Sequence, residues 1–293
     1  MIAMATMREI QRRINSVENT KKITRAMNMV ASAKLQRAQE SATAAKPFFE
    51  KTRQTLLGAF RRIREDVHPL LEKRDQMNRI GYIVITADRG LCGPYNTNVT
   101  RKVDEEVEDK SEVGMIAVGR NGRNHFKRND LEIFSEYLDL EDKPSIGLAQ
   151  NISNEASELY QDEVFDEVHL IYTQFNSVLS HEVKKLQLLP VEPQKIEDKD
   201  EEEGEELNAG YLYEPSPGEV LDVILPKYLR NLIYGSLLEA KASEFAARMT
   251  AMDSATENAK EMIEDLTRSF NRARQAEITQ EITEIAAGAE ALD

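Results

Sequence analysis

The chain of 293 residues is 41% hydrophobic and 31% charged, which is enough apolar material for one large domain or two modest ones. Its net charge of −14 is uneven, with a basic excess over residues 1–99 and an acidic excess over residues 100–220, and the acidic remainder argues against nucleic-acid binding. The single cysteine, Cys92, excludes an intrachain disulfide and favours a reducing compartment. No apolar run is long enough for a membrane-spanning helix, and residues 1–7 lack the features of a signal or transit peptide, so we expect a bacterial protein of the cytosol.

The first predicted element is a long helix, because residues 4–45 contain neither Gly nor Pro. Residues spaced alternately three and four apart predict a coiled-coil seam along it. The seam residues are Ile10, Ile14, Val17, Lys21, Thr24, Asn28, Ala31, Leu35, Ala38, Ala42, Ala45 and Phe49. Pro47 is expected to interrupt the helix, which then resumes through Arg64. Because small and polar seam residues bury little apolar area, this helix needs a partner helix to be stable.

The middle of the chain alternates between strand-like and helix-like segments. The run Ile80–Thr86 is almost wholly apolar, which is typical of a strand buried on both faces. A helix is expected to begin near Pro94 and another to cover residues 144–161. Further strands are predicted at residues 113–118, 167–175, 183–191 (as an edge strand) and 211–214. This alternation predicts a Rossmann-like twisted α/β sheet, and the charge run at residues 197–206 predicts a solvated loop.

The C-terminal region predicts a second long helix, since residues 236–287 contain neither Gly nor Pro and are bounded by Gly235 and Gly288. Its seam alternates steps of four and three and then shifts phase. The first part of the seam is Leu238, Ala242, Phe245, Met249, Met252, Thr256, Ala259, Ile263, Leu266, Phe270 and Ala273, and the shifted part is Ile278, Ile282, Ile285, Ala289 and Leu292.

The predicted fold class is therefore α/β, with a Rossmann-like twisted sheet domain and a long antiparallel coiled coil formed by the N- and C-terminal helices. Residues 1–76 form the N-terminal coiled-coil helix, residues 77–215 form the globular α/β domain, and residues 216–293 form the C-terminal helix that pairs with the first.

The sequence offers little support for catalysis or for a bound cofactor. Neither GxGxxG nor a P-loop occurs after the first predicted strand, and the four histidines form no dense group of metal ligands. We expect no catalytic residue, no cofactor and no metal. Two other classes remain open from the residues alone: a small α/β nucleotide-binding enzyme with helical extensions, and a coiled-coil scaffold.

Four segments resemble the gamma subunits of F-type ATP synthases. They are REIQRRINSVENTKKITRAMNMVASAKLQRAQ at residues 8–39, TADRGLCG at 86–93, ASEFAARMTAMDSATENAKEMI at 242–263 and NRARQAEITQEITEIAAGAEAL at 271–292. Because these segments occur in the order expected for the family and lie at both ends and in the middle of the chain, the resemblance covers the whole chain.

The resemblance implies a central-stalk rotor, itself non-catalytic, that transmits rotation between a proton-driven ring of c subunits and a catalytic hexamer of alpha and beta subunits. It also implies contact with the epsilon subunit and a peripheral location on the cytoplasmic face of the bacterial membrane. By position, it implies that Lys21, Lys22, Arg25 and Met27 face acidic loops of the beta subunits. Four residues of the C-terminal helix are likewise implied to contact partners: Arg274, Gln275, Glu281 and Glu284.

Overall fold

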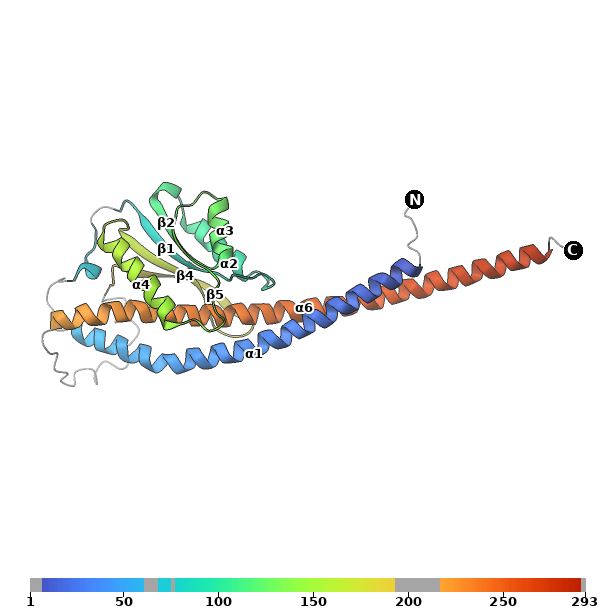
Figure 1. Ribbon diagram of the computed structural model, residues 1–293, viewed down its shortest axis with the longest axis horizontal. Coiled ribbons are helices and arrows are strands. Elements are labelled where there is room, and N and C mark those ends of the chain that lie inside the picture. The colour runs from blue at the N-terminus through green and yellow to red at the C-terminus, as the bar shows by residue number, and fades with distance from the viewer. Residues whose placement is uncertain (1–6, 61–67, 75–76, 193–216, 291–293) are drawn as a thin grey trace. The chain divides into compact units, whose positions relative to one another are not determined.

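The computed structural model describes residues 7–60, 68–74, 77–192 and 217–290 (Figure 1). Contacts divide the chain into two compact units. The sheet unit is Ser32–Arg248, and the coil unit combines Met1–Ala31 with Met249–Asp293. The predicted domain boundaries follow secondary structure rather than contacts and stay a prediction. The predicted loop at 197–206 and the predicted strand at 211–214 lie outside the described residues.

The sheet has five strands in the order β3-β2-β1-β4-β5. The central strand β1 pairs in parallel with β2 on one side and with β4 on the other, and β5 pairs antiparallel with β4 at the edge. The strands are β1 (Ile80–Ile85), β2 (Val113–Val118), β3 (Ile133–Tyr137), β4 (Glu167–Phe175) and β5 (His181–Leu189). The predicted Rossmann-like sheet is confirmed, including the edge position of its last strand.

Helices cover both faces of this sheet. Helices α2 (Tyr95–Glu106) and α3 (Arg120–Arg128) pack on the face that includes Tyr82, Val84 and Met115. The other face packs on α4 (Ile146–Gln161), on the end of α1 (Met7–Phe60) and on the start of α6 (Pro217–Glu290). Two short 3-10 helices, η1 (Pro69–Leu71) and η2 (Lys110–Glu112), precede β1 and β2. The long helices α1 and α6 each contribute residues to both units.

Gly81 and Gly114 allow the neighbouring strands β1 and β2 to accept the ring of Phe165. A Cβ atom at Gly81 would lie 2.5 Å from this ring, and one at Gly114 would lie closer still. Phe165 is fully buried and has an edge-on contact with Phe134, at 4.9 Å between ring centroids. Glycine at both strand positions is therefore required for packing.

The helix boundaries correct two expectations. α1 continues through Pro47 without a break, although proline removes one backbone hydrogen bond. α6 begins at Pro217 and passes without a break through Pro226 and through Gly235, the glycine that was expected to bound the second long helix. At Gly235 a Cβ atom would lie 3.1 Å from the ring of Phe49 on α1, so the glycine permits a close approach of two helices rather than ending one.

Candidate functional site

The coil unit pairs the two helices through small and polar side chains. The Asn28 amide donates to the carbonyl oxygen of Met249 at 2.9 Å, and the Thr256 hydroxyl donates to the Thr24 hydroxyl at 2.8 Å. Residue numbers rise on α1 as they fall on α6, so the pairing is antiparallel, as predicted. Every predicted seam residue of α1 is buried or half-buried. On α6 the seam is buried or half-buried from Leu238 to Ala273.

The basic group predicted on α1 lies beside this pairing. Lys22 and Arg25 are exposed, whereas Lys21 and Met27 are half-buried along the seam. Neither Lys22 nor Arg25 forms an ion pair with any residue that the structure describes. Their charges therefore remain available to an anionic partner.

Large apolar side chains are exposed in the same stretch of α1. Ile23 is 59% exposed, Met29 60% and Val30 55%. The predicted seam of α1 includes none of these three residues. The signal for their exposure was present in the sequence, because all three residues lie off the three-and-four spacing of the seam. Such a cluster beside free basic groups is typical of a surface that a partner covers.

The predicted C-terminal residues form a second, separate set. Met7 lies 17 positions before Thr24, so its level on α6 is about residue 273. Figure 1 shows α6 continuing past the start of α1. Arg274, Gln275, Glu281 and Glu284 are all exposed in this continuation, about 27 Å or more along the helix from Thr256. The structure thus places the eight predicted residues at two levels of the coil unit.

The shifted seam residues of α6 are exposed rather than packed. Ile278 is 48% exposed, Ile282 61% and Ile285 72%. They recur at steps of four and three, so they lie along one side of the helix. The alternating spacing predicted a continued seam here, but within the described residues no helix of the chain lies against this apolar stripe.

A different site, the crevice at the carboxyl ends of β1 and β4, tests the alternative of a nucleotide-binding enzyme. Open α/β sheets bind ligands where the strand order reverses, which is between β1 and β4 here. Ala87, Cys92 and Tyr95, which follow β1, share a buried cluster with Ala247 of α6. The Ser243 hydroxyl of α6 donates to the carbonyl oxygen of Thr173 on β4 at 3.2 Å. The chain's own helix therefore occupies this crevice.

Polar side chains at the loop after β1 likewise form hydrogen bonds within the chain. The carboxylate of Asp88 accepts from the backbone nitrogen of Arg120 at 2.9 Å and from that of Leu140 at 2.6 Å. The Thr86 hydroxyl donates to the Val118 carbonyl and accepts from the Gly122 nitrogen. Burial raises the pKa of the Cys92 thiol, which keeps it in the unreactive protonated form.

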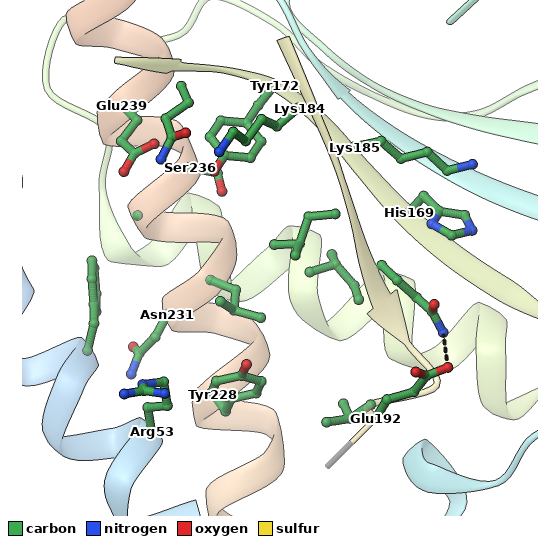
Figure 2. A pocket seen from close by; sticks show the side chains of 18 of the residues that line it. Arg53, His169, Tyr172, Lys184, Lys185, Glu192, Tyr228, Asn231, Ser236 and Glu239 are labelled. Carbon is green, nitrogen blue, oxygen red and sulfur yellow. Dashed lines mark hydrogen bonds between the residues drawn. The ribbon is translucent and has the colours of Figure 1, made fainter. Parts of the chain in front are cut away.

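The sheet unit also has a groove of about 670 Å³ between β5, α1 and α6 (Figure 2). Its wall combines apolar side chains with charges of both signs, including Arg53, Lys184 and Glu239. Several polar groups are already satisfied within the chain. The Asn231 amide donates to the Thr52 hydroxyl at 3.1 Å, and the Gln187 amide donates to the Glu192 carboxylate at 3.4 Å.

His169, at the rim of this groove, is a structural histidine. Its Nε2 atom lies 2.8 Å from the Glu167 carboxylate and its ring stacks on Tyr82. Burial is the main cause that lowers its pKa, so the ring stays neutral near pH 7. Among the described residues, no three His, Cys, Asp or Glu side chains are arranged to hold a metal ion. In the described part of the chain, no helix has the length and apolar content to cross a membrane.

Known proteins are similar to this chain over nearly its whole length. A protein-family model described as ATP synthase matches residues 6–292. The ATP synthase gamma chain of Halothermothrix orenii is 55% identical over 290 residues, covering 99% of this chain and 100% of that protein. The gamma chain of Heliobacterium modesticaldum is 48% identical over 293 residues, with the same coverage of both chains.

Solved structures of low identity share the fold. A chain in the OSCP, F1 and c-ring assembly of the Euglena gracilis mitochondrial ATP synthase aligns with a TM-score of 0.69 at 18% identity, covering 98% of this chain and 94% of that one. A chain in the central stalk and c-ring of the Tetrahymena thermophila mitochondrial ATP synthase aligns with a TM-score of 0.59 at 25% identity, covering 80% and 99%.

Proposed function

The chain belongs to the family of ATP synthase gamma chains, the non-catalytic stalk subunit, and from that premise we propose that it turns within a hexamer of alpha and beta subunits. The single observation that carries this proposal is the surface of the coil unit. Large apolar side chains, and basic groups that form no ion pair with a described residue, are exposed at two levels along it. Exposure of these apolar side chains to water is unfavourable, and surrounding subunits that bury them would stabilise the complex.

The coil surface suits rotation because its sides differ. The exposed residues of α1 include Lys22, Ile23 and Arg25, whereas the continuation of α6 carries the stripe of Ile278, Ile282 and Ile285. Each orientation of such a shaft would stabilise different conformations of the subunits around it. Because this coupling is reciprocal, nucleotide turnover in those subunits would drive rotation, and rotation would in turn drive synthesis.

The eight residues expected from the resemblance receive roles in this proposal. Lys22 and Arg25 would attract acidic loops of the beta subunits, and Lys21 and Met27 would border that contact. Arg274 would donate from its planar guanidinium to a beta-subunit loop, together with Gln275. Glu281 and Glu284 would lie deeper among the alpha and beta subunits. The exposure of Lys22, Arg25 and the four residues of α6, and the half-exposed positions of Lys21 and Met27, support these assignments.

For the sheet unit we propose contact with the epsilon subunit and the ring of c subunits, which places the assembly on the cytoplasmic face of a bacterial membrane. The bacterial origin of the gamma-chain relatives supports the location. The Tetrahymena structure, in which a central stalk occurs together with a c-ring, supports the ring contact.

The test is co-expression of the chain with its cognate alpha and beta subunits, followed by native mass measurement and an ATPase assay. We expect one copy of the chain in a complex with both partners, and rapid ATP hydrolysis only when all three are present. A matched variant with Ile278, Ile282 and Ile285 changed to Ser should assemble poorly. A chain that stays monomeric or forms homodimers in the presence of alpha and beta subunits would contradict the proposal and favour a scaffold.

A further inference from the structure

The segment of α6 from Lys241 to Arg248 carries buried charges within the sheet unit. The side chain of Glu244 is 7% exposed and that of Lys241 is 9% exposed. The Glu244 carboxylate lies 3.1 Å from the Lys241 ammonium and 2.8 Å from the Arg248 guanidinium. We call these three residues the charge cluster. They are satisfied by one another, at helix spacings of three and four.

Stability alone does not explain the charge cluster. Removing ions from water is costly, and replacing a buried ion network with apolar residues of similar size is often neutral or stabilising. The neighbouring residues Ala240, Ala242 and Ala246 show that apolar side chains are accommodated in this part of α6. The best-attested role of a buried polar group is to fix one register between packed elements.

The cluster and its neighbours are bonded to the loop and strand on which α6 lies. The Arg248 guanidinium donates to the carbonyl oxygen of Gly90 at 3.3 Å, and the Ser243 hydroxyl donates to that of Thr173. Hydrogen bonds are directional, so these two contacts fix both the rotation and the axial position of the helix in a way that apolar packing does not. The Asp88 carboxylate holds the same loop against the rest of the sheet unit by accepting hydrogen bonds from two backbone nitrogens.

Helix α1 also contacts α6 and a loop of the sheet unit, close to the charge cluster. The ammonium of Lys34 on α1 lies 5.7 Å from the ring centroid of Phe245 and 2.7 Å from the Asp142 carboxylate. Phe245 is buried within the same segment of α6, and Asp142 lies in the loop before α4. Both long helices are thus attached to loops of the sheet unit by directional polar contacts.

We propose that the charge cluster of Lys241, Glu244 and Arg248 acts as a positioning group that holds α6 in one register against the loop 88–93. The proposal rests on the rotor function. α6 is one continuous helix from the sheet unit into the coil unit, so torque applied to the sheet domain reaches the coil only if the helix neither turns nor slides against that domain. The cluster prevents this slip.

The first test changes all three residues to Met, which keeps side-chain bulk and removes the charges. The purified variant should unfold at or above the temperature of the parent chain. In the assembled enzyme in lipid vesicles, we expect about a twofold or larger loss of protons pumped per ATP hydrolysed. A variant that pumps as well as the parent per ATP would overturn the proposal. If the parent chain itself neither assembles nor pumps, the rotor function fails instead, so the two failures are distinguishable.

A second test measures register directly. Cys92 and Ala247 belong to one buried cluster and the chain has no other cysteine, so Ala247→Cys creates a single intrachain pair across the loop and α6. With diamide added as the two-electron oxidant of the two thiols, we expect this disulfide to form more slowly in the triple-Met background, and its formation there to restore pumping. The control carries Ala247→Cys with Cys92→Ser and should show no recovery. Equal rates of disulfide formation in both backgrounds, or a formed disulfide that leaves pumping low, would contradict the register role.

Discussion

The sheet unit and the coil unit use the same long helices in opposite ways. In the sheet unit α1 and α6 bury large side chains such as Leu57 and Leu225, and most described ion pairs lie there. In the coil unit the seam holds Thr24, Asn28 and Ala31, while Ile23 and Ile282 are more than half exposed. The first arrangement stabilises the chain by itself, and the second leaves apolar and charged groups for other chains.

The two units differ in whether their apolar residues stabilise the fold of the chain or its complex with other chains. Burial of apolar area within a chain stabilises its fold, whereas the same area left exposed contributes only when a partner covers it. A substitution in the sheet unit should therefore change the free energy of unfolding, and a substitution in the coil unit should change assembly.

The largest expected effect is in the core of the sheet unit. Ile83 is fully buried in the central strand, and Ile83→Ala should lower the free energy of unfolding by about 2–5 kcal/mol because it leaves a cavity. Denaturant unfolding of the purified chain measures this. The matched change Ile282→Ala in the coil unit should alter it by about 0.5 kcal/mol or less. Equal losses in the two variants would remove the distinction between the units.

The next effect concerns the apolar stripe of α6. Changing Ile278, Ile282 and Ile285 to Ser should weaken assembly with alpha and beta subunits by about tenfold or more, because each isoleucine loses burial in the complex. The unfolding temperature of the purified chain should stay nearly unchanged. The control changes the same residues to Leu and should assemble normally. Normal assembly of the Ser variant, measured by titration of the ATPase activity, would exclude the stripe as a contact.

Charge reversal at Lys22 and Arg25 should have a smaller effect that depends on salt. The double change to Glu should slow assembly about tenfold at low ionic strength and less at high ionic strength, because attraction between exposed charges is screened. Arg101→Glu with Lys143→Glu makes the same change in net charge at exposed positions of the sheet unit and serves as the control. If both double variants slow assembly equally, net charge rather than the coil surface is responsible.

Arg274→Ala should reduce coupling a few-fold while leaving the fold of the sheet unit intact, since the exposed guanidinium makes no described ion pair within the chain. Protons pumped per ATP in reconstituted vesicles measure the coupling, and circular dichroism checks the fold. Arg274→Lys should recover only part of the loss, because an ammonium lacks the planar fork of donors. Full coupling in the Ala variant would count against this contact.

The smallest expected effect is the dependence of the free energy of unfolding on pH, which arises from histidines of the sheet unit. All four histidines of the sequence lie in the sheet unit, and burial lowers the pKa of His68, His169 and His181 below 6.5. The folded chain then binds fewer protons than the unfolded chain, so the free energy of unfolding falls as the pH drops through about 6.5.

Thermal unfolding at pH 7.5 and 5.5 measures this effect, which we expect to be about 1 kcal/mol or less for each histidine. His169→Gln should reduce the difference between the two pH values. A difference unaffected by this change would mean that His169 does not contribute to it.

Sequence reasoning predicted the parts with strong local patterns. The apolar runs of β1, β2 and β4, the seam of α1 and the first part of the α6 seam were confirmed, whereas the shifted part of the α6 seam is exposed. It missed α3, whose nine residues include one glycine and a single large buried apolar side chain, Phe126, and it missed the half-buried edge strand β3. Such elements are fixed by tertiary contacts rather than by local pattern.

The candidate site was predicted in part. The free basic residues of α1 and the C-terminal polar residues came from resemblance, and their exposure agrees with that expectation. The exposed Ile23, Met29 and Val30 were missed because sequence alone assigns an apolar residue of a long helix to the core until the position of the partner helix is known. The bonds from α6 to the loop after β1 join residues 158 positions apart, a separation that no local pattern reports.

Rotation of the chain within the assembled complex tests the rotor function most directly. Cys92 is buried, so Glu112→Cys on the exposed η2 segment gives a unique reactive thiol for attaching a bead. With the alpha and beta subunits fixed to a surface, addition of ATP should turn the bead in one direction and in steps. A complex that hydrolyses ATP at the normal rate while the attached bead stays still would contradict the rotor function.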